Sequence, residues 1–123
     1  MATPATIQSE RLQMLINDNK KVLNNFYLVP CFGLANAIEL NNKEKQEEII
    51  NDIYQLYKEA DIDAIVLGCT HYPHIKDLIK KYFRKATLLD GGLGVAKETK
   101  RQMKLHGLIT NKGTCDVEFI KTK

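Results

Sequence analysis

Three side chains that can do chemistry stand side by side at Cys69, Thr70 and His71. They follow the apolar residues 64–67 and Gly68, a pattern that predicts a buried strand ending just before the cysteine. A thiol beside an imidazole can act as a nucleophile, as a metal ligand, or as an acid and base. A strand that leads into a helix exposes peptide N–H groups that attract anions, so Cys69 is placed to ionise.

The residues around this cluster support those three chemistries unequally. A Cys–His nucleophile needs an oxyanion hole and an orienting Asn or Asp, and the local sequence singles out neither. A zinc ion could use Cys69, His71 and His74, but no CxxC pair supplies a fourth ligand and Pro73 stiffens the segment. A structural alternative is that Cys69 is a small buried hydrophobe and His71 a hydrogen-bonded polar residue. The residues alone leave these alternatives open.

The composition predicts one modest domain. The chain has 123 residues, of which 44% are hydrophobic and 27% charged, values that suit a single core and exclude a disordered chain. No apolar run approaches the roughly 20 residues that cross a bilayer, and no secretory signal is visible, so we expect a cytoplasmic protein with no membrane partner. The net charge of the chain is +3. The basic residues at 79–85 are expected on the solvent-exposed face of a helix, so we predict no nucleic-acid binding.

The cysteines number three, at positions 31, 69 and 115, and are too widely separated for a disulfide framework. We expect free thiols, as in a reducing compartment. Cys31 follows Pro30 and is predicted to be a packing residue, whereas Cys115 lies in a polar segment and is predicted to be incidental.

The hydrophobic pattern alternates between helices and short strands. Helices are predicted at 8–20, with Ser9 as a cap, at 43–59, from Pro73 to about Tyr82, and at 95–106, ending at a left-handed Gly107. Strands are predicted at 26–30, 63–68, 86–90 and 116–121, with 63–68 covered on both faces. This alternation predicts a three-layer α/β lobe with a small parallel sheet, in which ligands bind beyond the carboxyl ends of the strands.

The segment GCTHYP, residues 68–73, resembles the second cysteine motif of bacterial glutamate racemase, a member of the aspartate/glutamate racemase superfamily. The likeness covers essentially the whole chain. ATPATI at 2–7 resembles the segment that opens the family's second lobe, and the spacing of Cys31 and Glu39 also matches. LLDGG at 88–92 and HGL at 106–108 extend the likeness toward the end of the chain. The resemblance is to the C-terminal half of the family's fold.

The resemblance implies a reaction without metal or cofactor, in which two thiols flank the α-carbon of glutamate. One thiolate removes the α-proton and the opposite thiol delivers another proton, which supplies D-glutamate for peptidoglycan. Carried over by match, Cys69 is the acid/base residue that takes the proton from L-glutamate. Thr70 and His71 would hold the substrate and tune the thiol, Glu39 would support His71, and Thr3 would line the substrate pocket.

The family's first lobe, which carries the partner cysteine, has no counterpart in this sequence, nor has the strand that precedes ATPATI in the family. We therefore expect residues 1–92 to form the second lobe without its first strand. Residues 93–123 would form a helix and strand arm that packs on the first lobe in the family. Because one thiol serves one face of the substrate, the expected partners are the missing half or a second copy. The alternatives are a silent fragment that binds or dimerises, and a Cys–His hydrolase or zinc site.

Overall fold

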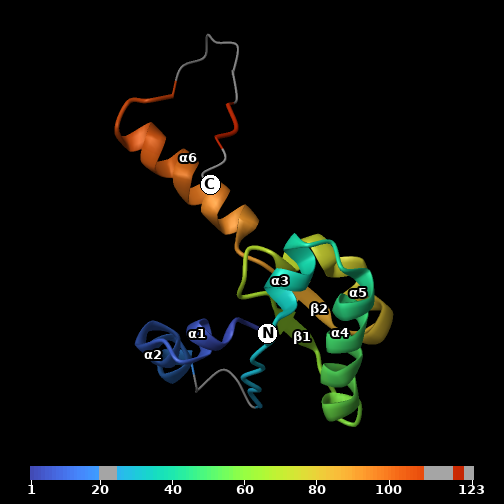
Figure 1. Cartoon of the computed structure of the whole chain (residues 1–123). Coiled ribbons are helices and arrows are strands. Elements are labelled where there is room, and N and C mark those ends of the chain that lie inside the picture. The colour runs from blue at the N-terminus through green and yellow to red at the C-terminus, as the bar shows by residue number, and fades with distance from the viewer. Residues whose placement is uncertain (20–24, 110–117, 121–123) are drawn as a thin grey trace. The chain divides into compact units, whose positions relative to one another are not determined.

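The computed structural model describes residues 1–19, 25–109 and 118–120 (Figure 1). The chain divides into two compact units, Met1–Gly91 and Gly92–Lys123, and each is described by itself. Within the described ranges, none of the helices combines the length and the apolar character needed to cross a membrane.

Helices precede each of the two strands of the first unit in the sequence. Its helices are α1 (Pro4–Ile7), α2 (Glu10–Asn19), α3 (Leu34–Glu39), α4 (Lys43–Tyr57), the 3-10 helix η1 (Tyr72–Ile75) and α5 (Lys76–Tyr82). The predicted helices at 8–20, at 43–59 and after Pro73 are confirmed as α2, α4 and η1–α5. The sequence analysis missed α1 and α3, because helices of one or two turns carry too little periodicity to be recognised.

Side chains that precede α2 and α4 cap them. The Leu12 N–H donates to Ser9 Oγ over 3.3 Å, as the sequence predicts. The Lys45 N–H donates to Asn42 Oδ1 over 3.0 Å, a cap that the sequence analysis did not identify. Both contacts satisfy a backbone donor that has no partner within its own helix.

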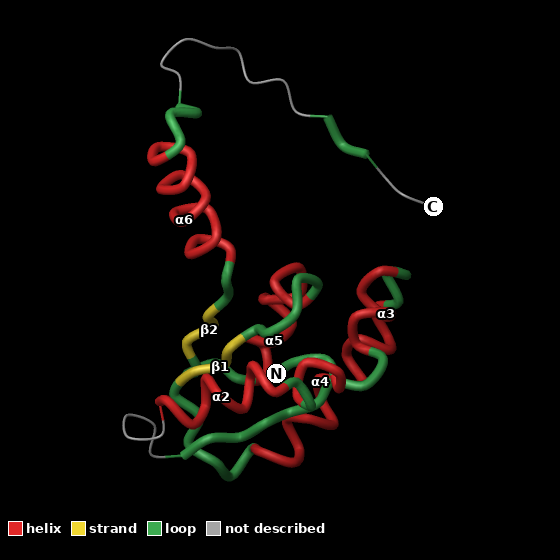
Figure 2. Tube along the Cα trace, turned by 90° about the vertical axis from the view of Figure 1, so that its left-hand side faces the viewer, coloured by secondary structure: helices red, strands yellow, loops and turns green. Residues whose placement is uncertain are grey.

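A two-stranded parallel sheet lies within the first unit (Figure 2). Strand β1 (Ala64–Val66) pairs with β2 (Thr87–Leu89), with Ile65 opposite Leu88. The strand predicted at 86–90 is confirmed, and the one predicted at 63–68 is confirmed but shorter. The fold is therefore α/β with a small parallel sheet.

The strand predicted at 26–30 is wrong: within the described residues this segment forms a single isolated parallel bridge, between Ala2 and Pro30. The Ala2 N–H donates to the Val29 carbonyl over 3.1 Å, and the Cys31 N–H donates to the Ala2 carbonyl over 2.9 Å. A strand needs a partner along its length, and here the partner is a single residue. Residue types favourable to a strand cannot supply that neighbour.

Met1 and Ala2 also contact the end of β1. The Met1 ammonium donates to the Val66 carbonyl over 3.0 Å, and the Gly68 N–H donates to the Met1 carbonyl over 2.9 Å. A Cβ at position 68 would lie 3.1 Å from Ala2 Cβ and 3.2 Å from the Met1 carbonyl oxygen. Glycine at 68 therefore allows the N-terminal residues to lie directly against the strand end.

The core lies on one face of the sheet. Ile65 and Leu67 point toward α3, α4 and α5, and the buried cluster consists of Cys31, Leu34, Ile50, Ile53, Ile65, Leu67, Tyr72, Ile75, Ile79, Phe83 and Ala86. The opposite face is open, since Ala64 is exposed and Val66 is 57% exposed. The prediction that 63–68 is covered on both faces is therefore wrong. The physical reason is an apolar groove of about 300 Å³ that Val66 lines together with residues of α2.

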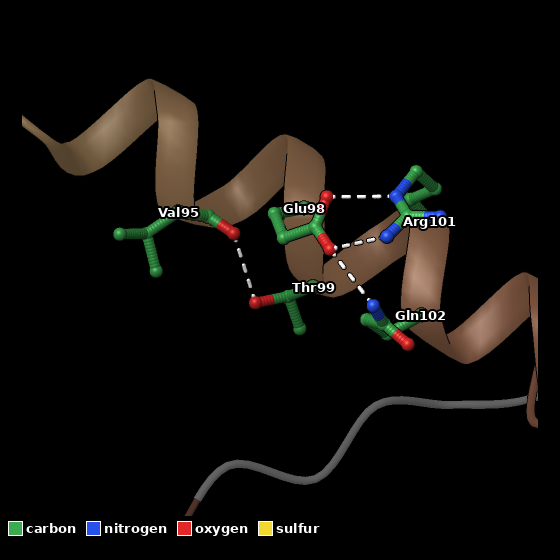
Figure 3. A network of polar contacts seen from close by, with 5 residues as sticks. All are labelled: Val95, Glu98, Thr99, Arg101 and Gln102. Carbon is green, nitrogen blue, oxygen red and sulfur yellow. Dashed lines mark hydrogen bonds and ion pairs between the residues drawn. The ribbon is translucent and has the colours of Figure 1, made fainter. Parts of the chain in front are cut away.

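The second unit is built on helix α6 (Gly92–Leu105), which begins slightly before the predicted start at 95. Gly107 has φ of 67°, and the Leu108 N–H donates to the Met103 carbonyl over 2.8 Å, so the predicted left-handed end is confirmed. Glu98 accepts hydrogen bonds from Arg101 and Gln102 along the same helix (Figure 3). None of the α6 residues is buried within the described part of the chain.

Of the strand predicted at 116–121, the structure describes residues 118–120, and these form no strand. The other residues of that range, and Cys115, lie outside the described residues.

Candidate active site

The Cys69–Thr70–His71 cluster lies in the turn between β1 and η1. The Tyr72 N–H donates to the Cys69 carbonyl over 3.2 Å, and the His74 N–H donates to the His71 carbonyl over 3.1 Å, which closes the turn. Tyr72 is wholly buried and anchors the turn in the core. The cluster is therefore held beyond the carboxyl end of a parallel strand, the edge at which α/β proteins bind ligands.

A thiol, an imidazole and a carboxylate lie in a row at this turn. Cys69 Sγ lies 3.6 Å from His71 Nδ1, within hydrogen-bonding range for sulfur. On the other side of the ring, His71 Nε2 lies 3.9 Å from Glu39 Oε2, an ion-pair distance rather than a hydrogen bond. Glu39 is the last residue of α3, which packs against η1. The structure thus brings together the three residues predicted to be catalytic.

This row can move a proton. A carboxylate near Nε2 favours a proton on that nitrogen, which leaves Nδ1 free to accept the hydrogen of the Cys69 thiol. The side chains of His71 and Glu39 are 37% and 72% exposed, and Cys69 is half-buried. A small molecule from solvent can therefore reach these groups. The turn combines access with a thiol that has a proton acceptor beside it.

The two residues predicted to bind substrate have different surroundings. Thr70 is exposed and has no hydrogen-bond partner among the described side chains and backbone. Thr3 caps α1: its Oγ1 accepts from the Thr6 N–H over 3.3 Å and lies 2.9 Å from Thr6 Oγ1. Thr3 follows Ala2, which lies against Gly68. The structure therefore gives Thr3 a capping role, and substrate binding by Thr3 and Thr70 stays a prediction.

A second thiol, Cys31, lies beneath the turn and is 2% exposed. Its Sγ lies 3.5 Å from the Val29 carbonyl, and burial raises the pKa of Cys31 above its ordinary value. A buried thiol with a raised pKa stays protonated at neutral pH, so Cys31 is suited to packing rather than to proton transfer. The prediction that Cys31 is a packing residue is confirmed.

The sequence analysis missed Tyr72, which forms the floor of the turn. Burial raises the pKa of Tyr72 far above its ordinary value, and the nearby thiols of Cys31 and Cys69 raise it further. Tyr72 therefore stays neutral and adds no negative charge below Cys69. The sequence does contain a signal for this burial, because Tyr72 stands directly before Pro73 at the start of a helix with an apolar stripe.

The zinc alternative finds no support in the described parts of the chain. No group of three or more His, Cys, Asp or Glu side chains lies close enough there to hold a metal ion. His74 and its neighbours therefore offer no ligand set for zinc among those residues.

The two described thiols should differ sharply in reactivity. We expect iodoacetamide to alkylate Cys69 at least about tenfold faster than Cys31 in the folded chain, because alkylation requires an accessible thiolate. Peptide mapping by mass spectrometry at short reaction times separates the two sites from each other and from Cys115. Alkylation in urea is the control, and there the difference should disappear. Equal rates in the folded chain would contradict the geometry of the turn.

Comparisons with known proteins relate this α/β unit to a class of isomerases, the amino-acid racemases. The chain is similar to glutamate racemase from Clostridium botulinum (strain Alaska E43), with 36% identity over 114 residues, 89% of this chain and 43% of that protein. It is 32% identical to glutamate racemase from Clostridium perfringens (strain SM101) over 126 aligned residues, which cover 95% of this chain and 47% of the relative. Glutamate racemase from Clostridium acetobutylicum is 32% identical over 89% of this chain. The resemblance to glutamate racemase is therefore confirmed.

The chain spans less than half the length of these curated relatives, between 43% and 47% of the first two. No family model matches the chain. No solved structure matches it either.

Proposed function

We propose that this chain forms the second-cysteine lobe of a glutamate racemase and that Cys69 transfers the α-proton of glutamate. The observation that carries the proposal is the row of Cys69, His71 and Glu39 beyond the end of β1. The GCTHYP motif at 68–73 and the glutamate racemases among the relatives support the choice of reaction and substrate.

In the proposed reaction, the Cys69 thiolate removes the α-proton of L-glutamate, so that an S–H bond forms as the C–H bond breaks. The electron pair stays on the α-carbon as a carbanion. A thiol on the opposite face then donates its proton to that carbon and becomes a thiolate. The product is D-glutamate, and the two sulfurs have exchanged their protonation states. No cofactor takes part.

The residues of this chain make the thiolate available. His71 accepts or returns the Cys69 proton through Nδ1, and Glu39 stabilises the charge that the imidazole then carries. The α-proton of an amino acid is a very weak acid, so the site must stabilise the carbanion through fixed polar groups. Thr70 and Thr3 are proposed to contact the substrate at the same strand end.

The second thiol must come from another polypeptide segment in this proposal, because Cys31 is buried and un-ionised. We propose that residues 1–92 act as one lobe and that residues 93–123 form an arm toward the cysteine-bearing half. In that assembly the protein would make D-glutamate for peptidoglycan in the cytoplasm. A three-layer racemase lobe is the fold that this proposal requires.

The proposal is tested by following the α-proton of glutamate by NMR in D₂O. The chain alone should exchange the α-proton of L-glutamate for deuterium faster than that of D-glutamate, because Cys69 serves one face of the carbon. It should form no D-glutamate, which chiral chromatography measures. Heat-denatured protein is the control.

Two outcomes would reject the proposal. If the α-proton of glutamate exchanges no faster than with heat-denatured protein, the chain is a catalytically silent fragment. Formation of D-glutamate by the chain alone as fast as exchange would show that the second thiol is not needed.

A further inference from the structure

A cleft lies at the amino ends of the two strands, away from the Cys69 turn. The strands β1 and β2 are parallel and each follows a helix, so the carboxyl ends of α4 and α5, which pack against each other, meet at this edge (Figure 1). The cleft opens between the loops 58–63 and 83–86, which connect these helices to the strands. Its volume is about 520 Å³, within the range of roughly 300 to 1,000 Å³ that small-molecule sites occupy.

Positive charge lines this cleft. Lys58 comes from the loop after α4, Arg84 and Lys85 come from the loop after α5, and all three residues are exposed. None of these three side chains forms an ion pair with the residues that the structure describes. The negative carboxyl end of α5 is already compensated, because Lys80 and Lys81 lie in its last turn. The three cations can therefore bind an anion.

The loop that carries two of these cations is held in place by hydrogen bonds. Lys80 Nζ donates to the Arg84 carbonyl over 3.1 Å and to the Ala86 carbonyl over 2.7 Å. The Ala86 N–H also donates to the Phe83 carbonyl, over 3.3 Å. A backbone that is fixed before a ligand arrives lowers the entropic cost of binding. The loop is therefore preorganised to present Arg84 and Lys85.

Aromatic rings line the same cleft. The Tyr54 ring lies 5.5 Å from the Phe83 ring, edge to face, and 5.6 Å from the Tyr82 ring, measured between centroids. Tyr57 is a further lining residue from α4. The three tyrosines are half-buried, so their rings are fixed by packing and still partly accessible. A planar ring of a ligand can stack on such side chains, and every nucleobase has a face suited to this.

The carboxylates near the cleft differ in their contacts. Glu47 accepts hydrogen bonds from Lys81 and from the Tyr82 hydroxyl, so its charge and that of Lys81 offset each other. Asp61 lines the cleft and forms no ion pair within the described ranges. A simple anion would be repelled by Asp61, whereas the neighbouring hydroxyls of a ribose would donate to it. The cleft therefore matches a ligand that joins an anion, a sugar and a planar ring.

We propose that this cleft binds a nucleoside monophosphate. The phosphate bonds to Lys58, Arg84 and Lys85, and the base stacks on the tyrosine rings. The ribose hydroxyls donate to Asp61. The proposal is separate from the proposed function, because the cleft lies at the amino ends of the strands and Cys69 beyond the carboxyl end of β1.

Calorimetry with the whole chain compares AMP with its two parts, adenosine and inorganic phosphate. We expect AMP to bind at least about tenfold tighter than either part, because each part makes only some of the contacts. Dideoxy-AMP, which lacks both ribose hydroxyls, should bind more weakly than AMP. Added salt should weaken the binding of AMP, since exposed cations are screened.

A matched pair of variants locates the binding. Arg84→Gln removes one charge from the cleft and should weaken the binding of AMP about tenfold. Arg11→Gln removes the same charge from an exposed position on α2, outside the cleft, and should change the binding less than about twofold. Circular dichroism verifies that both variants are folded, as expected for substitutions at exposed positions.

Four results would overturn the proposal. They are no binding of AMP to folded chain, binding of adenosine or inorganic phosphate as tight as that of AMP, equal binding of AMP and dideoxy-AMP, and equal effects of the two variants. An RNA strand of six adenylates that binds tenfold or more tighter than AMP would also overturn it, and would assign the cleft to a nucleic acid instead.

Discussion

Cys69→Ala should abolish the exchange of the α-proton of L-glutamate, with a loss of about 10²- to 10⁴-fold in rate. Of the two described thiols, alanine removes the one that is both accessible and beside an imidazole, since Cys69 Sγ lies 3.6 Å from His71 Nδ1. The fold should survive the change, because Cys69 is half-buried and lies at the edge of the core. Proton NMR in D₂O measures the exchange, and urea denaturation measures the stability of the same samples.

Cys31→Ala is the matched control. Cys31 is buried under the same turn, so its loss should lower the free energy of unfolding but leave the rate of exchange per folded molecule unchanged. Equal loss of exchange in both variants would mean that the turn, rather than the Cys69 thiol, is what the reaction requires. Full exchange in Cys69→Ala would remove the proposed acid/base residue.

Local patterns explain why α4 was predictable and the segment at 26–30 was not. In α4 the buried residues Ile50 and Ile53 recur at helical spacing, so the sequence itself contains the face that packs. The segment at 26–30 has the residue types of a strand, but pairing depends on what lies beside it. Among the described residues the backbone partner of this segment is Ala2, which is distant in the sequence.

The same distinction applies to the candidate site. Cys69 and His71 could be placed at a strand end from the sequence, because a strand, a glycine and a proline-started helix follow one another there. Glu39 entered only through the resemblance, since its distance of 3.9 Å from His71 depends on how α3 packs against η1. Burial of Tyr72 and exposure of Val66 are tertiary properties. An apolar run shows that burial is favourable, not that a covering layer is present.

Ile50→Ala should strongly destabilise the first unit, with a loss of about 2 to 5 kcal/mol in the free energy of unfolding. Ile50 is fully buried in α4, which packs against both α3 and α5, and these helices cover the face of the sheet that carries Ile65. Truncation removes apolar contacts and leaves a cavity at the centre of the cluster.

Leu56→Ala is the matched control for Ile50→Ala, because it removes a similar side chain from the same helix at a position that is 78% exposed. Alanine there should change stability by less than about 0.5 kcal/mol. Urea denaturation followed by circular dichroism compares the two variants. A small single domain has about 5 to 15 kcal/mol of stability, so Ile50→Ala should populate unfolded chain under mild denaturant while Leu56→Ala stays folded. Equal stabilities would show that Ile50 is not packed at the centre of the cluster that α3, α4 and α5 share.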